Sequence, residues 1–163
     1  MEYILRERVI DFGAYSLYLE AIRDRLPPNV AAFAADERHF SLDAQETLHD
    51  AWLIELTVRE PAAGEREQQR ATAIEVRLLG PFHDRVHVLR YRGVRRYELV
   101  AGRVDGGHGD LYTHEVRLAS DGVGLIHEYL FLGSAAGPES RLLVECADFT
   151  HEMLPRNLAA NGT

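Results

Sequence analysis

Residues 48–58 decide the fold, because there the chain changes from a helical pattern to the alternation of a β-strand. They read LHDAWLIELTV, a His-Asp pair followed by apolar side chains at every second position. A period of two places successive side chains on opposite faces of a strand. We therefore predict a strand at 52–58 with one apolar face, formed by Trp52, Ile54, Leu56 and Val58.

The same pattern recurs before a second alternating run. Residues 82–91 read FHDRVHVLRY, so His83 and Asp84 repeat the arrangement of His49 and Asp50. Each pair places a titratable ring and a carboxylate immediately before a strand. At that position the same two groups can bind a ligand, bind a metal or form the hydrogen bonds of a turn. In the turn interpretation, the aspartate accepts backbone N–H bonds just ahead of the strand. The pattern leaves these interpretations open.

Six further strands are indicated by alternation between turn residues, at 74–78, 86–88, 97–101, 112–118, 125–132 and 141–149. Gly93 marks the bend between the third and fourth strands. Most connections are too short for a crossover helix, so neighbouring strands should be antiparallel. We expect a mainly antiparallel sheet of about seven strands, a meander that is partly closed or folded over itself.

The residues before 48 have a helical pattern. Asp11 is a suitable N-cap, Pro27 and Pro28 end the first helix, and the alanine-rich residues 29–35 predict a second. These helices should cover one face or edge of the sheet. The chain is thus predicted to be one α+β domain over residues 1–163, with the division helical 10–40, strand-rich 48–150 and loose tail 155–163.

The composition limits where the protein works. Its 46% hydrophobic and 27% charged residues are typical of globular domains. No apolar stretch is long enough for a membrane span, and the first residues lack the pattern of a signal peptide. The single cysteine, Cys146, allows no internal disulfide and fits a reducing cytoplasm. We expect it to be a small core side chain.

The charge distribution favours a protein partner over nucleic acid. All 18 Lys and Arg residues are arginine, which excludes lysine-based catalysis, and the net charge of −8 disfavours sequence-blind DNA binding. Residues 85–103 carry six arginines and one glutamate, so this stretch is +5 and the remainder is −13. These arginines form either an anion or nucleic-acid patch, or a solvated face that pairs with carboxylates on neighbouring strands.

A metal site is an alternative that the histidine spacing raises. On a strand, His83 and His87 lie about 13 Å apart, so one ion takes both only if His83 belongs to the turn. Adding His49, Asp50 and Asp84 gives the mixed nitrogen and oxygen donors that a divalent metal such as zinc uses. The sequence has no HExxH and no paired-cysteine motif, so we expect no cofactor.

No motif assigns a reaction, so whether the chain is an enzyme stays open, with a non-catalytic role favoured. The serines lack a Gly-x-Ser-x-Gly context, and the glycine-rich residues 102–109 open no predicted helix. His127 and Glu128 are neighbours on a strand and point to opposite faces. His114 is expected to be a hydrogen-bonded core residue. In a further alternative, His114 or His127 supplies polarity to a small-ligand site between sheet and helices.

Three segments, 48–54, 89–97 and 144–149, resemble small uncharacterised bacterial domains that have a Leu-His-Asp motif before the first strand. Some of those domains are regarded as immunity proteins beside bacterial toxins. The resemblance spans about residues 48–150 and brings no catalytic residues. It implies a non-catalytic acidic binding protein, an immunity-like inhibitor that masks a basic partner.

The residues that we select as candidates for binding combine the first His-Asp pair with the arginine stretch: His49, Asp50, Arg90, Arg92, Arg95 and Arg96. Exposed strand edges also make a homodimer a reasonable expectation.

Overall fold

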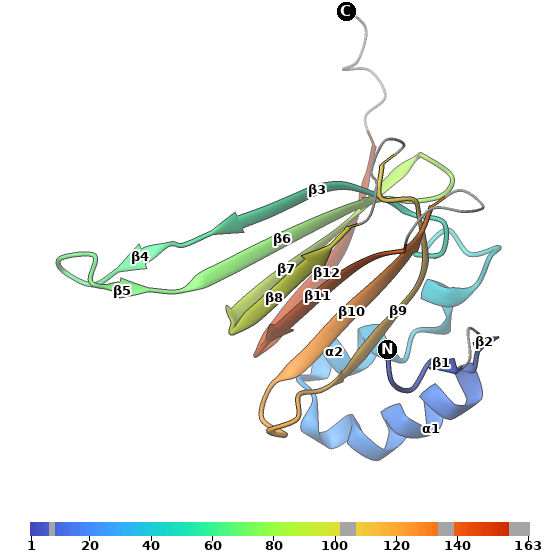
Figure 1. The fold of residues 1–163 in the computed structure, drawn as a ribbon, viewed down its shortest axis with the longest axis horizontal. Helices are drawn as coiled ribbons and strands as arrows, with labels where there is room; N and C mark the ends of the chain where they lie inside the picture. The colour runs from blue at the N-terminus through green and yellow to red at the C-terminus, as the bar shows by residue number, and fades with distance from the viewer. Residues whose placement is uncertain (7–8, 102–106, 134–138, 157–163) are drawn as a thin grey trace, which may run out of the picture.

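A computed structural model describes residues 1–6, 9–101, 107–133 and 139–156 of the chain. Within these residues it contains two α-helices, two short 3-10 helices, one antiparallel sheet of eight strands and two two-stranded ribbons (Figure 1). The predicted α+β class and antiparallel sheet are confirmed. The predicted number of about seven strands is wrong, because the main sheet has eight. No helix in the described ranges is both long and apolar enough to cross a membrane.

The helical region follows the punctuation of the sequence. Its elements are α1 (Phe12–Ile22), η1 (Arg23–Arg25), α2 (Pro28–Ala34) and η2 (Glu37–Phe40). The Asp11 carboxylate accepts the backbone N–H of Ala14 at 2.9 Å, a cap that stabilises the first turn of α1. Pro28 begins α2, where a helix requires no N–H donor. Two helices are confirmed, but the first ends at Ile22, and η1 occupies part of the stretch that was predicted to be helical up to Pro27.

The main sheet has the strand order β12-β7-β6-β3-β9-β10-β11-β8. Its strands are β3 (Trp52–Arg59), β6 (Thr72–Leu79), β7 (Arg85–Val94), β8 (Arg96–Val100), β9 (Asp110–Leu118), β10 (Leu125–Leu132), β11 (Ser140–Cys146) and β12 (Asp148–Pro155). The ribbons are β1 (Leu5–Arg6) with β2 (Val9–Ile10) and β4 (Ala62–Ala63) with β5 (Gln69–Arg70). The second ribbon continues β3 and β6 away from the helices (Figure 1).

The eighth strand arises because the run predicted as one strand at 141–149 bends at Ala147, whereas the bend at Gly93 is as predicted. β7 and β8 are the two parts of one long bent strand, and β11 and β12 are the two parts of another. The two long strands pair with each other, β7 with β12 and β8 with β11, and bend at the same place. Gly93 adopts φ +61° there, and the Ala147 N–H donates to the carbonyl groups of Arg92 and Gly93. The run predicted as one strand is therefore two. β12 extends to Pro155, so the predicted loose tail at 155–163 does not include this residue; residues 157–163 lie outside the described part.

A bulge in β3 corrects the predicted apolar face. The register shifts between Leu53 and Glu55, and such an extra residue moves the side chains that follow to the other face. Leu56 pairs with Val76 on the inner face, whereas Trp52 pairs with Leu79 on the outer face. Trp52 and Leu56 thus lie on opposite faces of the sheet.

The sheet is not closed into a barrel over the described residues. β3 and β9 pair only at Trp52 and Asp110, and beyond this point α1 lies along β9 (Figure 1). The Tyr15 hydroxyl accepts the N–H of Val116 at 2.8 Å, and the Tyr18 hydroxyl accepts the N–H of Leu118 at 2.9 Å. Two tyrosines of α1 therefore satisfy backbone groups that a neighbouring strand would satisfy in a closed barrel.

The hydrophobic core lies between the inner face of the sheet and the helices. Phe33 of α2 packs against Phe149 of β12, with ring centroids 5.2 Å apart. Cys146 is buried in the same core, as expected from its apolar surroundings in the sequence. Burial raises the pKa of its thiol to about 12, which leaves this cysteine a poor nucleophile.

Candidate functional site

Both His-Asp motifs form turns. Asp50 and His83 have φ values of +62° and +58°, a conformation in which Asp and His are enriched among non-glycine residues. The Asp50 N–H donates to Leu111 and the His83 N–H donates to Gly80, each at 2.9 Å. The Asp50 carboxylate faces the His49 ring at 3.0 Å. The motifs thus supply turn geometry, although this aspartate contacts its own histidine instead of a backbone N–H group.

The structure does not bring together the five candidate metal ligands His49, Asp50, His83, Asp84 and His87. The His83 ring packs on Trp52 at 4.4 Å, and Asp84 lies 3.5 Å from the Arg85 guanidinium. His87 is buried and points its Nδ1 atom at Nε2 of His151, 3.0 Å away. Among the residues that the structure describes, no group of three or more His, Cys, Asp or Glu side chains is arranged to hold a metal ion.

Three of the four candidate binding arginines are paired with carboxylates. Arg90 forms ion pairs with Glu75, at 2.8 Å, and with Glu152. Arg95 forms ion pairs with Asp121, at 2.6 Å, and with Glu145, at 2.9 Å. Arg96 forms an ion pair with Glu98 at 2.6 Å. The guanidinium of Arg95 holds the pKa of the Asp121 carboxyl well below its usual range. Arg92 is exposed, and Arg103 lies outside the described residues. The solvated and paired interpretation of this stretch therefore describes it better than an open anion patch.

A group of rings, the ring cluster, lies under α2 and is buried except for His151, which is half-buried. Its members are His39, His87, His114, His127, His151, Tyr91 and Tyr129. His127 is its centre: its Nε2 atom lies 3.2 Å from Nδ1 of His114, and its Nδ1 atom lies 2.8 Å from the Tyr91 hydroxyl. The expectation that His114 is a hydrogen-bonded core residue is confirmed.

The histidines of the ring cluster are neutral near pH 7. Burial lowers the pKa of His87 to about 4 and that of His151 to about 3. Burial also lowers the pKa values of His114 and His127 well below the usual value, and the neighbouring histidines add to this effect. The ring cluster is consequently an uncharged, hydrogen-bonded part of the core.

A groove of about 940 Å³ runs between α1, α2 and η2. Its apolar wall includes Phe12, Leu19, Leu26, Ala31, Ala34 and Phe40, and its charged side chains are Glu20, Arg23, Asp24 and Glu37. The Phe40 ring stacks on His114 with the centroids 4.5 Å apart, so the groove lies directly above the ring cluster. No sequence motif marks this groove, because it is formed by the angle between two helices.

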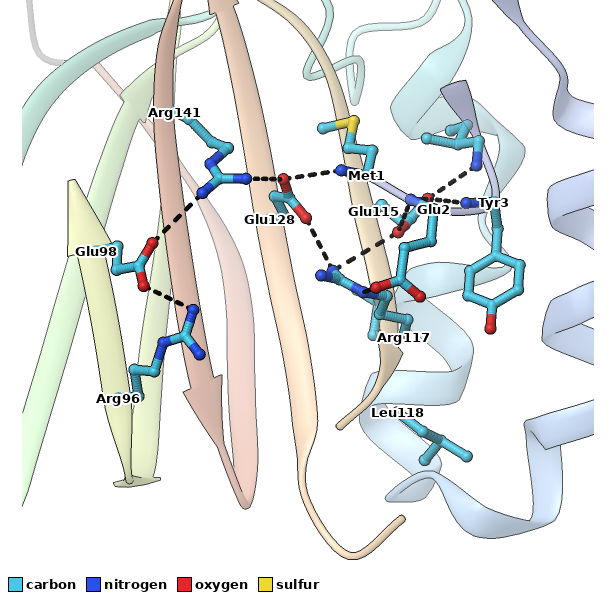
Figure 2. A network of polar contacts seen from close by, with 12 residues as sticks. Met1, Glu2, Tyr3, Arg96, Glu98, Glu115, Arg117, Leu118, Glu128 and Arg141 are labelled. Carbon is cyan, nitrogen blue, oxygen red and sulfur yellow. Dashed lines mark hydrogen bonds and ion pairs between the residues drawn. The ribbon is translucent and has the colours of Figure 1, made fainter. Parts of the chain in front are cut away.

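A second polar network fixes the N-terminal residues to β9 and β10 (Figure 2). The buried Glu115 carboxylate accepts the N–H groups of Glu2 at 3.0 Å, Tyr3 at 2.7 Å and Ile4 at 2.8 Å. Glu115 thereby compensates three backbone donors at once. Its role is to hold the first residues of the chain against the sheet.

The neighbouring carboxylate, Glu128, is buried among positive charges. The Met1 ammonium and Arg117 both lie 2.9 Å from it, and Arg141 lies 3.3 Å away (Figure 2). Burial alone would raise the pKa of Glu128. The hydrogen bond and charge of Met1, together with the charges of the two arginines, have a larger opposite effect, so the pKa lies below its usual value. Glu128 is therefore an ionised structural residue instead of a candidate acid.

Comparison with known proteins identifies no relative: no family model, no curated protein and no solved structure matches this chain.

Proposed function

We propose that this chain is a non-catalytic binding protein that holds an amphipathic, basic segment of a partner protein in the groove between α1 and α2. The observation that carries the proposal is the combination of apolar walls and an acidic rim in one groove. A helix with one apolar face binds such a groove by burying that face and leaving its polar face at the rim.

The size and burial of the groove suit such a segment. Its volume of about 940 Å³ lies at the upper end of the range of ligand pockets. Tyr15, Leu19 and Leu26 are packed into the core, so this wall of the groove is fixed before binding, and Phe12, which is 42% exposed, offers apolar surface to the segment. Preorganisation of this kind lowers the entropic cost of association.

The charge of the rim selects a basic segment. Glu20, Asp24 and Glu37 line the groove against one cation, Arg23. The whole chain carries −8, so attraction of a basic partner begins at long range and strengthens near the groove. We expect this attraction to weaken with added salt.

The most specific form of the proposal is an immunity-like inhibitor of bacterial type that masks a basic toxin. The charge balance supports it, as does the resemblance of residues 48–150 to domains of that kind. A cytoplasmic location is part of the same proposal, supported by a single cysteine, Cys146, that is buried.

The test uses a fluorescently labelled model peptide that forms a helix with one face of Leu and the opposite face of Lys. The peptide is about 14 residues long, which is about four turns. We expect saturable binding by fluorescence anisotropy, loss of affinity with salt, and no binding of the matching Leu/Glu peptide. Ala32→Trp places a large ring in the groove and should abolish binding. Ala21→Trp, on an exposed position of α1 outside the groove, is the matched control.

Two results would overturn the proposal. Binding that is equal in the Ala32→Trp and Ala21→Trp variants would show that the peptide does not use the groove. A groove that takes the neutral probe N-phenyl-1-naphthylamine but not the Leu/Lys peptide would identify the small-ligand alternative, with Phe40 above His114 as its floor.

A further inference from the structure

One wall of the groove rests on the ring cluster. We call residues 28–40, which comprise α2 and η2, the α2–η2 segment. Its Phe33 ring has four imidazole rings around it, with the centroids between 4.4 and 5.5 Å away: His39, His114, His127 and His151. The Phe40 ring stacks on His114 at 4.5 Å. The packing of this segment against the sheet therefore depends on rings that can take up a proton.

Within the described residues, no carboxylate is hydrogen-bonded to His39, His114 or His127. Their partners are a neighbouring imidazole, a carbonyl group and two hydroxyls, the last three belonging to Phe33, Tyr91 and Tyr129. The Nε2 atom of His114 is buried and has no hydrogen-bond partner in this part of the chain. A proton taken up here would therefore be a buried charge without a counter-charge, which is costly.

The other ionisable groups near these three rings do not supply the missing negative charge. Asp36 and Glu46 raise the pKa of His39, but burial has the larger, opposite effect. Both carboxylates also pair with Arg38, at 2.7 and 2.8 Å. α2 carries no charged side chain. The remaining groups that face the rings are neutral side chains of the ring cluster: His87, Tyr91, Tyr129 and His151.

The α2–η2 segment is attached less firmly than the strands beneath it. α2 has seven residues and no side-chain cap at its N-terminus. In the described residues, the hydrogen bonds from α2 to the sheet come from Asn29, whose amide donates to the Asp148 carboxylate at 2.9 Å and to the Phe149 carbonyl group. The strands are joined by continuous backbone ladders. A short helix held in this way opens at a lower cost than the sheet.

We propose that protonation of the ring cluster lifts the α2–η2 segment off the sheet, so that the groove exists only while these rings are neutral. The inference rests on the proposed function, because Pro28, Ala31 and Phe40 of this segment line the groove. It adds regulation to that function: acid opens the groove and releases the bound partner. Conversely, an occupied groove holds the segment down and opposes the uptake of protons.

The direction of the pH dependence follows from burial. Burial lowers the pKa of His39, and it lowers the pKa values of His114 and His127 well below the usual value. Opening returns these rings toward the ordinary pKa of about 6.5, so the open form binds more protons. The opening equilibrium constant therefore stays low above a pH of about 6.5. It rises as the pH falls, by up to about tenfold per pH unit for each ring that opening exposes.

Hydrogen exchange of the chain without peptide tests the opening directly. The Ala31 and Ala35 amides donate hydrogen bonds at the two ends of α2 and report on the segment, whereas the amides of β10 report on the sheet. We expect the α2 protection factors to be lower than those of β10 at every pH. Between a pH of about 7.5 and about 5, they should fall by about a hundredfold or more.

Two variants assign this fall to the ring cluster. His114→Phe keeps a ring against Phe40 but binds no proton, so the fall should be about tenfold smaller. Tyr129→Phe is the matched control, because it also removes a polar contact, 3.2 Å from His127. Burial raises the pKa of Tyr129, so its hydroxyl keeps its proton and the control should retain the wild-type pH dependence. His39→Gln, whose amide can still donate to the Phe33 carbonyl group, replaces His114→Phe if that variant does not fold.

The Leu/Lys peptide tests the consequence for the groove. Its dissociation constant should rise over the same pH range in the wild type and in Tyr129→Phe, and rise less in His114→Phe. The acidic rim is the same in all three chains, so this difference reports on the ring cluster.

Equal protection of the α2 and β10 amides at each pH would show that acid acts only by global unfolding and would overturn the proposal. Equal pH dependence of α2 protection in His114→Phe and Tyr129→Phe would overturn it as well. Opening of α2 in acid without peptide binding at any pH would refute the proposed function and would support the acid-driven opening.

Discussion

The hydroxyl of Tyr15 satisfies both backbone groups of Val116, because it donates to the carbonyl group at 3.2 Å and accepts the N–H at 2.8 Å. Through this contact a helix takes the place of a β-strand at the edge of β9. It also keeps that stretch of edge from pairing with another chain, which is a common hazard of open sheets.

Tyr15→Phe should destabilise the fold by about 1–3 kcal/mol, because the N–H and carbonyl groups of Val116 lose a buried partner while the packing is retained. The measurement is the free energy of unfolding in urea. Tyr97→Phe, at an exposed position in β8, is the control and should have little effect. Equal urea midpoints for Tyr15→Phe and the wild type would show that the hydroxyl is not needed at this edge.

Acid should destabilise the protein through the ring cluster. The pKa values of its histidines are depressed in the folded state, to about 4 for His87 and about 3 for His151, because burial disfavours the charged ring. Stability is therefore complete above the unfolded pKa of about 6.5 and falls as pH decreases toward the folded values. Each such group contributes about 1.4 kcal/mol per pH unit within that window.

The measurement is the free energy of urea unfolding against pH between about 7.5 and about 5. His151→Gln removes one titrating ring. The slope of the unfolding free energy against pH should therefore decrease by the equivalent of about one bound proton, even if the variant is less stable at neutral pH. The wild-type chain supplies the reference slope. Equal slopes for the wild type and His151→Gln would contradict the assignment of the acid sensitivity to the ring cluster.

Glu115→Gln should loosen the N-terminal residues. The charged acceptor of the Tyr3 and Ile4 N–H groups becomes neutral, at a cost of about 1–3 kcal/mol. Hydrogen exchange should accelerate at these two amides and not at the core of β10. Glu2→Gln loses only the 3.3 Å contact of a largely exposed carboxylate with Arg117 and serves as control. Unchanged exchange at Tyr3 and Ile4 would refute the proposed anchor.

Gly93→Ala should destabilise the shared bend of the two long strands. Position 93 has φ +61°, which is strained for alanine, and the new Cβ would lie 2.8 Å from the Cβ of Ala147. We expect a loss of about 1–3 kcal/mol, visible as a lower Tm. Adding Ala147→Gly removes the close contact but not the φ strain, so it should restore only part of the loss. A Gly93→Ala variant with the wild-type Tm would be inconsistent with this account.

Local signals predicted the elements of this fold well. Asp11 and the Pro27–Pro28 pair affect the backbone only within a few residues of their own positions. Alternation of apolar and polar residues likewise indicates a strand at the positions where it occurs. Ala147 gave no such signal, because its bend is imposed by pairing with the Gly93 region. The bulge after Leu53 was missed for a related reason: it is defined by the register with β6.

The candidate sites depended on information that short motifs do not contain. The sequence identifies His114 as a core residue, but its pairing with Tyr129 and its approach to His127 require the register of β9 and β10. The repeated His-Asp motif is visible in the chain, yet its residues form two separate turns. The groove is determined by how two helices pack, and no residue pattern records that arrangement.

The joined bends of β7 with β8 and of β11 with β12 also have a consequence for synthesis on the ribosome. Arg85 finds its partner in Pro155, and Val100 finds its partner in Arg141, so one ladder links distant parts of the chain and crosses both halves of the sheet. Distant pairings of this kind slow folding. The nascent chain can complete the half with β8 once β11 has emerged, but not the half with β7, whose edge stays open to chaperones and to other unfinished chains until β12 has emerged.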